Sequence, residues 1–177
     1  SGMFKNCAAE YAAIARHLKS NYPKLPIISG GVYASLMADK ILVNLPEIDF
    51  ILFNEADQTL VQFLDAINGQ EQDTALKGIA VLNQEGEPVS TEGAIAPMID
   101  IIPDYKELPI GDYAKHGTIG AYTFLREAGT PAATVISRRG CRAACSFCSV
   151  RTVSGKGVRV RSSQTVAQEI KFLHKTY

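Results

Sequence analysis

The chain has 177 residues, of which 46% are hydrophobic and 20% are charged, with 18 basic and 18 acidic side chains. These are ordinary values for a folded globular chain, and they argue against disorder. The longest apolar runs are far shorter than the roughly 20 residues that span a bilayer, so we expect no membrane span. The chain begins without a secretion leader and stops inside a helical pattern. We therefore expect a cytoplasmic location and a piece of a longer protein.

The first 70 residues alternate between helical and strand patterns. The spacing of apolar residues predicts helices over 5–19, 33–44 and 57–67, and short buried strands over 25–29 and 48–53. Strands that alternate with helices are typical of parallel strands joined by right-handed crossovers. The sequence therefore predicts half of a doubly wound α/β sheet over residues 1–70.

The middle of the chain has a different character. Two strand-like runs, 78–82 and 87–91, flank a polar turn that ends in Gly86, and this pattern predicts a β-hairpin. Residues 93–131 carry four prolines among scattered apolar residues and indicate a linker that packs on its neighbours. We assign residues 71–131 to this hairpin and linker.

The last part of the chain, residues 132–177, forms a third predicted region. Residues 132–137 predict a strand that runs into a cysteine-rich loop, and residues 163–176 predict a helix. Either Ser162 or Ser163 can cap that helix at its amino terminus. This region also holds a basic run, 138–161, which contains seven Arg and Lys residues and no acidic residue.

The cysteine-rich loop carries the chemistry that the sequence indicates most clearly. Cys141, Cys145 and Cys148 are spaced C-x3-C-x2-C, and Gly140 before them allows a tight entry from the strand. Clustered thiols in a chain without a leader indicate metal ligands in a reducing compartment. Three thiolates on one loop can bind three irons of a cubic iron–sulfur cluster and leave the fourth iron open.

A closed zinc site is the alternative that the residues leave open. Zinc in a structural site takes four ligands, and the loop supplies only three. A fourth ligand would have to come from elsewhere in the sequence, and the possibilities are Cys7, His17, His116 and His174. The sequence shows no arrangement of nucleophile, histidine and acid, and we assign no side chain as a catalytic group.

With Phe147 directly before its third cysteine, the loop resembles the cluster signature of the radical S-adenosylmethionine (radical SAM) superfamily. The resemblance implies that Cys141, Cys145 and Cys148 hold a [4Fe-4S] cluster. It also implies that S-adenosylmethionine chelates the open iron, that Phe147 lies against its adenine, and that reductive cleavage yields a 5′-deoxyadenosyl radical. The strand 132–137 and the helix 163–176 would then open a radical SAM partial TIM barrel.

The amino-terminal half adds a second resemblance. Ser1-Gly2-Met3 and Gly30-Gly31 are similar to the S-x-L and G-G elements of flavodoxin-like cobalamin-binding domains. Together with Glu55 after a predicted strand, the hairpin, the linker and the cysteine loop, they resemble the B12-binding radical SAM subfamily along most of the chain. The resemblance implies that Ser1, Gly2, Met3, Gly30, Gly31 and Glu55 contact cobalamin.

The resemblance also implies a reaction and partners. Cobalamin would act as a methyl carrier or radical partner in methyl transfer or cyclisation at an unactivated carbon. A small-molecule substrate and an electron donor of the flavodoxin or ferredoxin type are implied, and the chain alone is expected to be inactive because most of the barrel is missing. Nucleic acid is disfavoured, since the basic run holds a single aromatic residue. The alternatives are a cobalamin-independent enzyme similar to tRNA methylthiotransferases and a non-enzymatic zinc-binding module.

Overall fold

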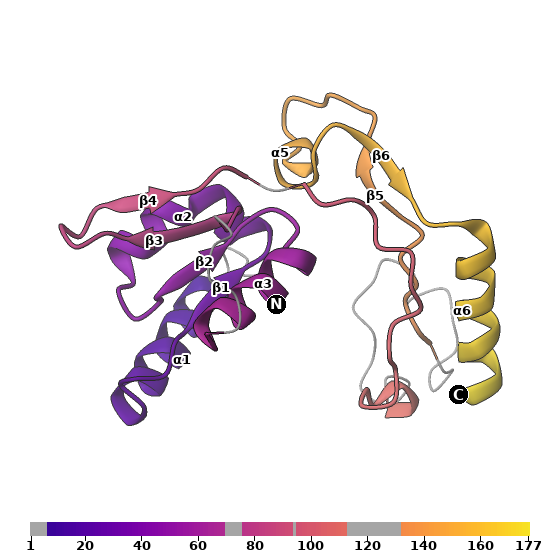
Figure 1. Ribbon diagram of the computed structural model, residues 1–177, viewed down its shortest axis with the longest axis horizontal. Coiled ribbons are helices and arrows are strands. Elements are labelled where there is room, and N and C mark those ends of the chain that lie inside the picture. The colour runs from indigo at the N-terminus through magenta and orange to yellow at the C-terminus, as the bar shows by residue number, and fades with distance from the viewer. Residues whose placement is uncertain (1–6, 70–75, 94, 113–131) are drawn as a thin grey trace. The chain divides into compact units, whose positions relative to one another are not determined.

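The computed structural model of the chain describes residues 7–69, 76–93, 95–112 and 132–177 (Figure 1). Its internal contacts divide the chain into two compact units. The first unit joins Ser1–Ala96 to Gly140–Gly157, and the second joins Pro97–Arg139 to Val158–Tyr177. The cysteine loop therefore packs with the amino-terminal region. The domain boundaries inferred from the sequence remain predictions.

The first unit contains a four-stranded sheet. Its strands, in spatial order, are β1 (Ile28–Gly30), β2 (Phe50–Leu52), β3 (Ile79–Leu82) and β4 (Pro88–Ser90). Strands β1 and β2 run parallel, whereas β3 is antiparallel to both β2 and β4. The predicted parallel pair and the predicted hairpin are both confirmed. The hairpin pairs with β2 through β3, so the two predicted pieces form one mixed sheet.

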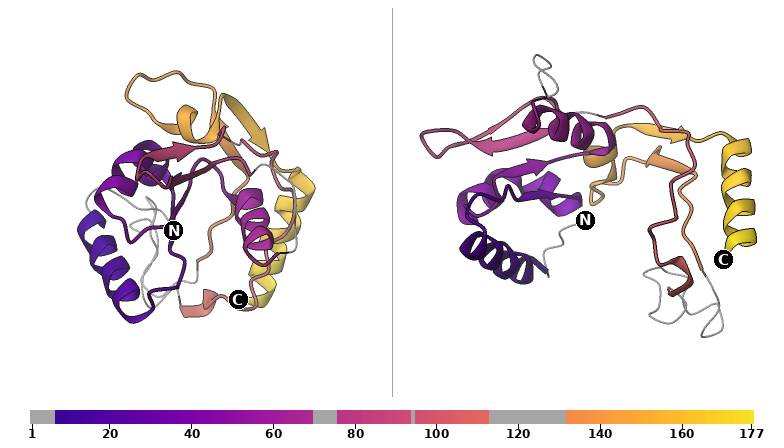
Figure 2. Two further views of the ribbon diagram at one scale, coloured as in Figure 1. Left: turned by 60° about the vertical axis from the view of Figure 1, so that its left-hand side comes forward. Right: turned by 60° about the horizontal axis from the view of Figure 1, so that its bottom comes forward.

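Helices cover both faces of this sheet, as the views in Figure 2 show. The helices are α1 (Ala8–Asn21), α2 (Val32–Asn44) and α3 (Asp57–Ile67), each close to its predicted bounds. Successive strand residues point to opposite faces. Ile51 and its cross-strand partner Ala80 are buried in a core with α1 and α2, whereas Leu52 and Ile79 pack with Phe63 of α3. The unit thus has three layers.

Three further elements surround the cysteine loop. They are β5 (Arg138–Cys141), α5 (Val150–Ser154) and β6 (Gly157–Val160), and β5 and β6 form a two-stranded sheet. The sequence patterns did not predict α5 or β6, because both elements are shorter than the windows in which apolar periodicity is visible. Gly155, at a φ of 76°, ends α5 in a conformation that favours glycine.

The second unit is organised around α6 (Ser163–Thr176), which confirms the predicted helix. The hydroxyl of Ser162 accepts a hydrogen bond from the Thr165 backbone N–H at 3.1 Å, so Ser162 is the capping residue. Leu173 of α6 packs with Tyr105 and with Ile110 of the short 3-10 helix η2 (Ile110–Asp112). None of the described helices combines the length and apolar character of a bilayer-spanning segment.

The strand predicted over residues 132–137 is wrong, because regular pairing begins only at Arg138. Just before that point, Ser137 O still accepts a backbone N–H, that of Arg161, at 3.0 Å, but Ile136 O accepts the Arg161 side chain instead, also at 3.0 Å. Ile136 is also largely exposed, unlike a residue of a buried strand. An apolar run predicts burial, but a strand also needs a neighbouring backbone to pair with.

Candidate metal and cofactor site

The carboxyl ends of β1 and β2 lie side by side because the two strands are parallel. Gly30, the last residue of β1, pairs with Leu52, the last residue of β2. A Cβ atom on Gly30 would lie 3.1 Å from the Leu52 carbonyl oxygen, so a larger residue would crowd the strand end. Gly31 then begins α2 at a φ of 94°, which favours glycine. Ligands of parallel α/β sheets bind at this kind of edge.

The loop after β2 adds polar groups to the same edge. Asn54 has a φ of 63°, the left-handed region that asparagine adopts more readily than most residues. Its backbone N–H donates to Ser35 Oγ at 3.0 Å, and the Ser35 hydroxyl donates to Gly31 O at 2.8 Å. Glu55 follows and is half-buried. Gly31, Asn54 and Glu55 are therefore connected at one edge of the sheet.

The cysteine loop presents three free thiols. Cys141 is half-buried, Cys145 and Cys148 are exposed, and the Cys148 N–H donates to Cys145 O at 3.2 Å in a tight turn. Gly140 has a φ of 84°, and a Cβ there would lie 2.3 Å from the Gly157 carbonyl oxygen. Only glycine fits this approach, as the predicted tight entry requires.

The positions of the three thiols bear on metal binding. Within the described ranges, no three His, Cys, Asp or Glu side chains are arranged as a ready metal site. The thiols share one short loop and none is in a disulfide, so the donor set suits an iron–sulfur cluster. The side chains would have to turn toward a common centre when the cluster binds. Phe147, next to the third cysteine, is 90% exposed.

Three of the four other residues considered as metal ligands lie in the described part of the chain, and none of them belongs to a ready metal site there. Cys7 is half-buried at the start of α1, and His17 is exposed on that helix, where its backbone carbonyl accepts a hydrogen bond from the Asn21 side-chain amide. His174 is exposed on α6 of the second unit. His116 lies outside the described residues, as do the predicted cobalamin contacts Ser1, Gly2 and Met3.

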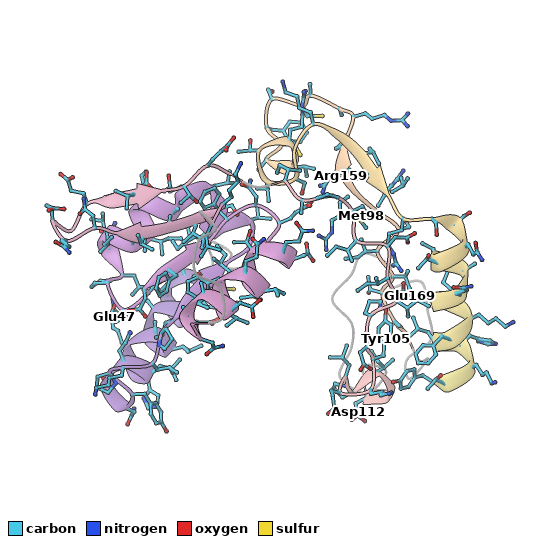
Figure 3. The ribbon with its side chains drawn as sticks, in the orientation of Figure 1. Glu47, Met98, Tyr105, Asp112, Arg159 and Glu169 are labelled. Carbon is cyan, nitrogen blue, oxygen red and sulfur yellow. The ribbon has the colours of Figure 1, made fainter. Side chains whose placement is uncertain are left out.

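Arg161 differs from the other members of the basic run. Its guanidinium is buried in the second unit, where Nη1 lies 2.5 Å from Glu169 Oε2 and Nη2 donates to Ile101 O at 2.7 Å. The Tyr105 hydroxyl donates to Glu169 Oε1, and these two residues point toward each other in Figure 3. Arg161 therefore holds the second unit together. The Arg161–Glu169 ion pair could not be predicted from the sequence, because Arg161 is one of several basic residues in a uniform charge run.

The pKa of Tyr105 reflects these surroundings. Burial, followed by the hydrogen bond to Glu169 and the negative charge of that residue, raises the pKa of the Tyr105 hydroxyl to about 12. Removing the phenol proton would leave two negative charges in contact inside a region of low dielectric. The hydroxyl is therefore a permanent hydrogen-bond donor to Glu169 at neutral pH.

The fold and the site together define a mixed α/β protein in which a three-cysteine loop belongs to the same compact unit as the sheet. No protein-family model matches the chain. The chain is 29% identical over 161 residues to the anaerobic magnesium-protoporphyrin IX monomethyl ester cyclase of Synechocystis sp., a match that covers 90% of this chain and 30% of the relative.

Two solved enzymes share the fold. The radical S-adenosylmethionine methyltransferase TsrM from Kitasatospora setae matches with a TM-score of 0.73 and 16% identity, over 96% of this chain and 31% of that chain. Its structures contain tryptophan and a SAM analogue, or cobalamin and a [4Fe-4S] cluster. The cobalamin-dependent S-adenosylmethionine radical enzyme OxsB, with aqua-cobalamin and S-adenosylmethionine bound, matches with a TM-score of 0.68 and 18% identity, over 97% of this chain and 22% of that chain.

These relatives and neighbours agree with the resemblance found in the sequence. The chain is similar in sequence to the anaerobic cyclase and similar in fold to radical SAM enzymes that bind cobalamin. It spans about a third or less of the length of these three proteins.

Proposed function

We propose that the chain is the cobalamin- and cluster-binding part of a cobalamin-dependent radical SAM enzyme. The observation that carries this proposal is that one compact unit contains both the three free thiols and the carboxyl edge of the β1–β2 pair. Strand ends of this kind bind ligands, and three thiols on a loop suit an open cluster.

The cysteine loop has assigned roles in this proposal. Cys141, Cys145 and Cys148 would hold a [4Fe-4S] cluster, which supplies the electron for reductive cleavage of S-adenosylmethionine. The exposed ring of Phe147 offers a flat apolar face on which an adenine can stack. Arg142, exposed within the loop, adds positive charge that offsets the negative charge of thiolates and sulfides.

The sheet edge has the second set of roles. Gly30 and Gly31 let a large ligand approach the backbone closely, because neither position carries a side chain. Glu55, half-buried after β2, would contact the same cobalamin together with Ser1, Gly2 and Met3. The sheet, its helices and this edge would then be the carboxyl-terminal part of a flavodoxin-like cobalamin domain.

The proposed reaction is methyl transfer or cyclisation at an unactivated carbon of a small molecule, with cobalamin as methyl carrier or radical partner. Methyl transfer is the activity named for TsrM, and cyclisation is the activity named for the Synechocystis relative. An electron donor of the flavodoxin or ferredoxin type would reduce the cluster. A reducing compartment such as the cytoplasm would preserve the free thiols. We propose that the 177-residue chain alone does not turn over.

Anaerobic reconstitution of the chain with iron and sulfide tests the cluster assignment. We expect iron and sulfide to bind together, and the electron spin resonance signal of the reduced cluster to change when S-adenosylmethionine is added. Cys145→Ala should lose the cluster, whereas Cys7→Ala should keep it. Zinc in anaerobically purified chain, with no uptake of iron, would support a metal-binding module instead and refute the proposal.

A separate titration with hydroxocobalamin tests the sheet edge. We expect the corrinoid absorbance to co-purify with the wild-type chain and to be lower for Gly31→Val. A branched side chain disfavours the positive φ at this position and would also occupy space next to the ligand. Cluster uptake without corrinoid binding would favour a cobalamin-independent radical SAM enzyme.

A further inference from the structure

We propose that Asn54 is a positioning residue for the cluster loop: its side-chain amide fastens α5, which follows Cys148, to the carboxyl edge of the sheet. This inference deepens the proposed function and rests on it. It concerns a residue that has no role in the cluster signature or in the glycine pair.

The hydrogen bonds of the Asn54 amide carry the argument. Nδ2 donates to Thr152 O at 3.0 Å and to Val153 O at 3.1 Å, so the amide bridges two carbonyl groups of α5. The last carbonyl groups of a helix have no partner within the helix, and a five-residue helix consists almost entirely of such ends. Asn54 therefore satisfies two acceptors that α5 cannot satisfy itself.

The backbone of Asn54 fixes the other end of the connection. Its N–H is held by Ser35 Oγ, which in turn donates to Gly31 O. The left-handed φ of 63° turns the chain sharply after β2. One residue thus connects the start of α2, the end of β2 and the helix after the third cysteine.

The surroundings of the amide leave little freedom. A Cβ atom at Gly93 would lie 2.7 Å from Asn54 Oδ1, so the backbone of residue 93 passes directly beside the side chain. Val153 of α5 is buried, and a Cβ at Gly155 would lie 3.1 Å from the Ile95 side chain. Helix α5 is therefore packed within the first unit, and the Asn54 side chain hydrogen-bonds it directly to the loop after β2.

Because α5 follows Cys148 almost directly along the chain, the Asn54 hydrogen bonds to α5 also affect the metal site. Cys148 lies directly before Ser149, whose carbonyl oxygen accepts the Thr152 and Val153 N–H groups at 3.0 Å each. Fixing the far end of α5 therefore limits how far its first turn and the adjacent Cys148 can move. The open thiol arrangement has to close around a cluster, and a fixed third ligand lowers the entropy lost in that step.

Two substitutions test the role. Asn54→Gly keeps the left-handed backbone and removes the amide, and Asn54→Asp keeps the shape but places a carboxylate against two carbonyl oxygens. The matched control is Asn44→Asp, because the Asn44 amide donates to Lys40 O at 2.7 Å at the opposite end of α2. Amide hydrogen exchange of the chain without metal is measured first, and iron uptake second.

We expect exchange of residues 149–154 to rise roughly tenfold or more in both Asn54 variants, since each neutral hydrogen bond is worth about a fivefold change in local opening. Exchange in α1 and β3 should stay unchanged, and Asn44→Asp should behave as wild type in the loop. Both Asn54 variants should take up several-fold less iron than wild type at equal iron and sulfide concentrations.

Unchanged exchange of residues 149–154 in both variants would overturn the inference, because the amide would then not hold α5. Faster exchange with wild-type iron uptake would also overturn it and leave Asn54 a purely structural contact. A wild-type chain that binds no iron would refute the proposed function itself, and the exchange measurement distinguishes that result from the loss of the anchor.

Discussion

Replacing Glu169 should destabilise the second unit more than any exposed charge replacement. Glu169 is 1% exposed, accepts the Tyr105 hydroxyl, and lies 2.5 Å from the Arg161 guanidinium, whose side chain is 4% exposed. In Glu169→Gln the shape is retained, but the buried Arg161 cation loses its nearest and only buried carboxylate partner among the described residues. Breaking a buried pair from one side costs roughly 3–5 kcal/mol.

A second acidic partner of the same arginine provides the control. Asp100 Oδ1 lies 3.7 Å from Arg161 Nε, and its side chain is 39% exposed. Asp100→Asn should therefore cost clearly less stability than Glu169→Gln, because an exposed ion pair contributes little. Tyr105→Phe should fall between the two at about 1.5–3 kcal/mol, because it removes a hydrogen bond to a charged acceptor.

Urea unfolding followed by circular dichroism measures these differences, since the chain contains no tryptophan for fluorescence. Equal losses of stability in Glu169→Gln and Asp100→Asn would refute the reasoning, because burial would then not separate the two pairs.

Three further outcomes are expected. Gly140→Ala should lower the free energy of unfolding by about 2–4 kcal/mol, because Gly140 has a left-handed φ and an added Cβ would clash with the Gly157 carbonyl. Gly157→Ala is the control: Gly157 has a similar φ but open space around it, so the loss in the same urea experiment should be about 1 kcal/mol. Because the pKa of Tyr105 is raised to about 12, its stabilising effect should be complete below pH 10 and lost as pH rises from 10 to 12; in alkaline titrations Tyr105→Phe should lack this loss. Cys145→Ala should remove most bound iron after anaerobic reconstitution and Cys7→Ala should not, and equal iron contents would contradict the ligand assignment.

Much of the fold could be predicted from local sequence patterns. The helices α1, α2, α3 and α6 have apolar residues at helical spacing, and the polar turn ending in Gly86 specifies the hairpin. The parallel pairing of β1 and β2 followed from the helix between them. These features depend on interactions within a few residues or on a single connection, so they can be read along the chain.

The cysteine loop was also visible in the sequence, because its three thiols and Gly140 are close neighbours along the chain. The failed strand over 132–137 marks the limit of such reasoning. Residues 132–137 are an apolar run of the kind that a buried strand has. Strand formation also depends on a second segment, and the side chain of Arg161, 25 residues away, donates to the Ile136 carbonyl instead.

The sequence by itself determined the three-thiol motif, the glycine pair and the main helices, since each is written in consecutive or periodically spaced residues. Only the tertiary structure decided that Asn54 binds the helix after the cysteines, 98 and 99 residues further along, and that Arg161 is buried against Glu169. The sequence alone does not distinguish an asparagine or arginine in a solvated loop from one in a buried contact. The partners of such a residue are set by the folding of distant segments, and those long-range contacts leave no periodic trace in the sequence.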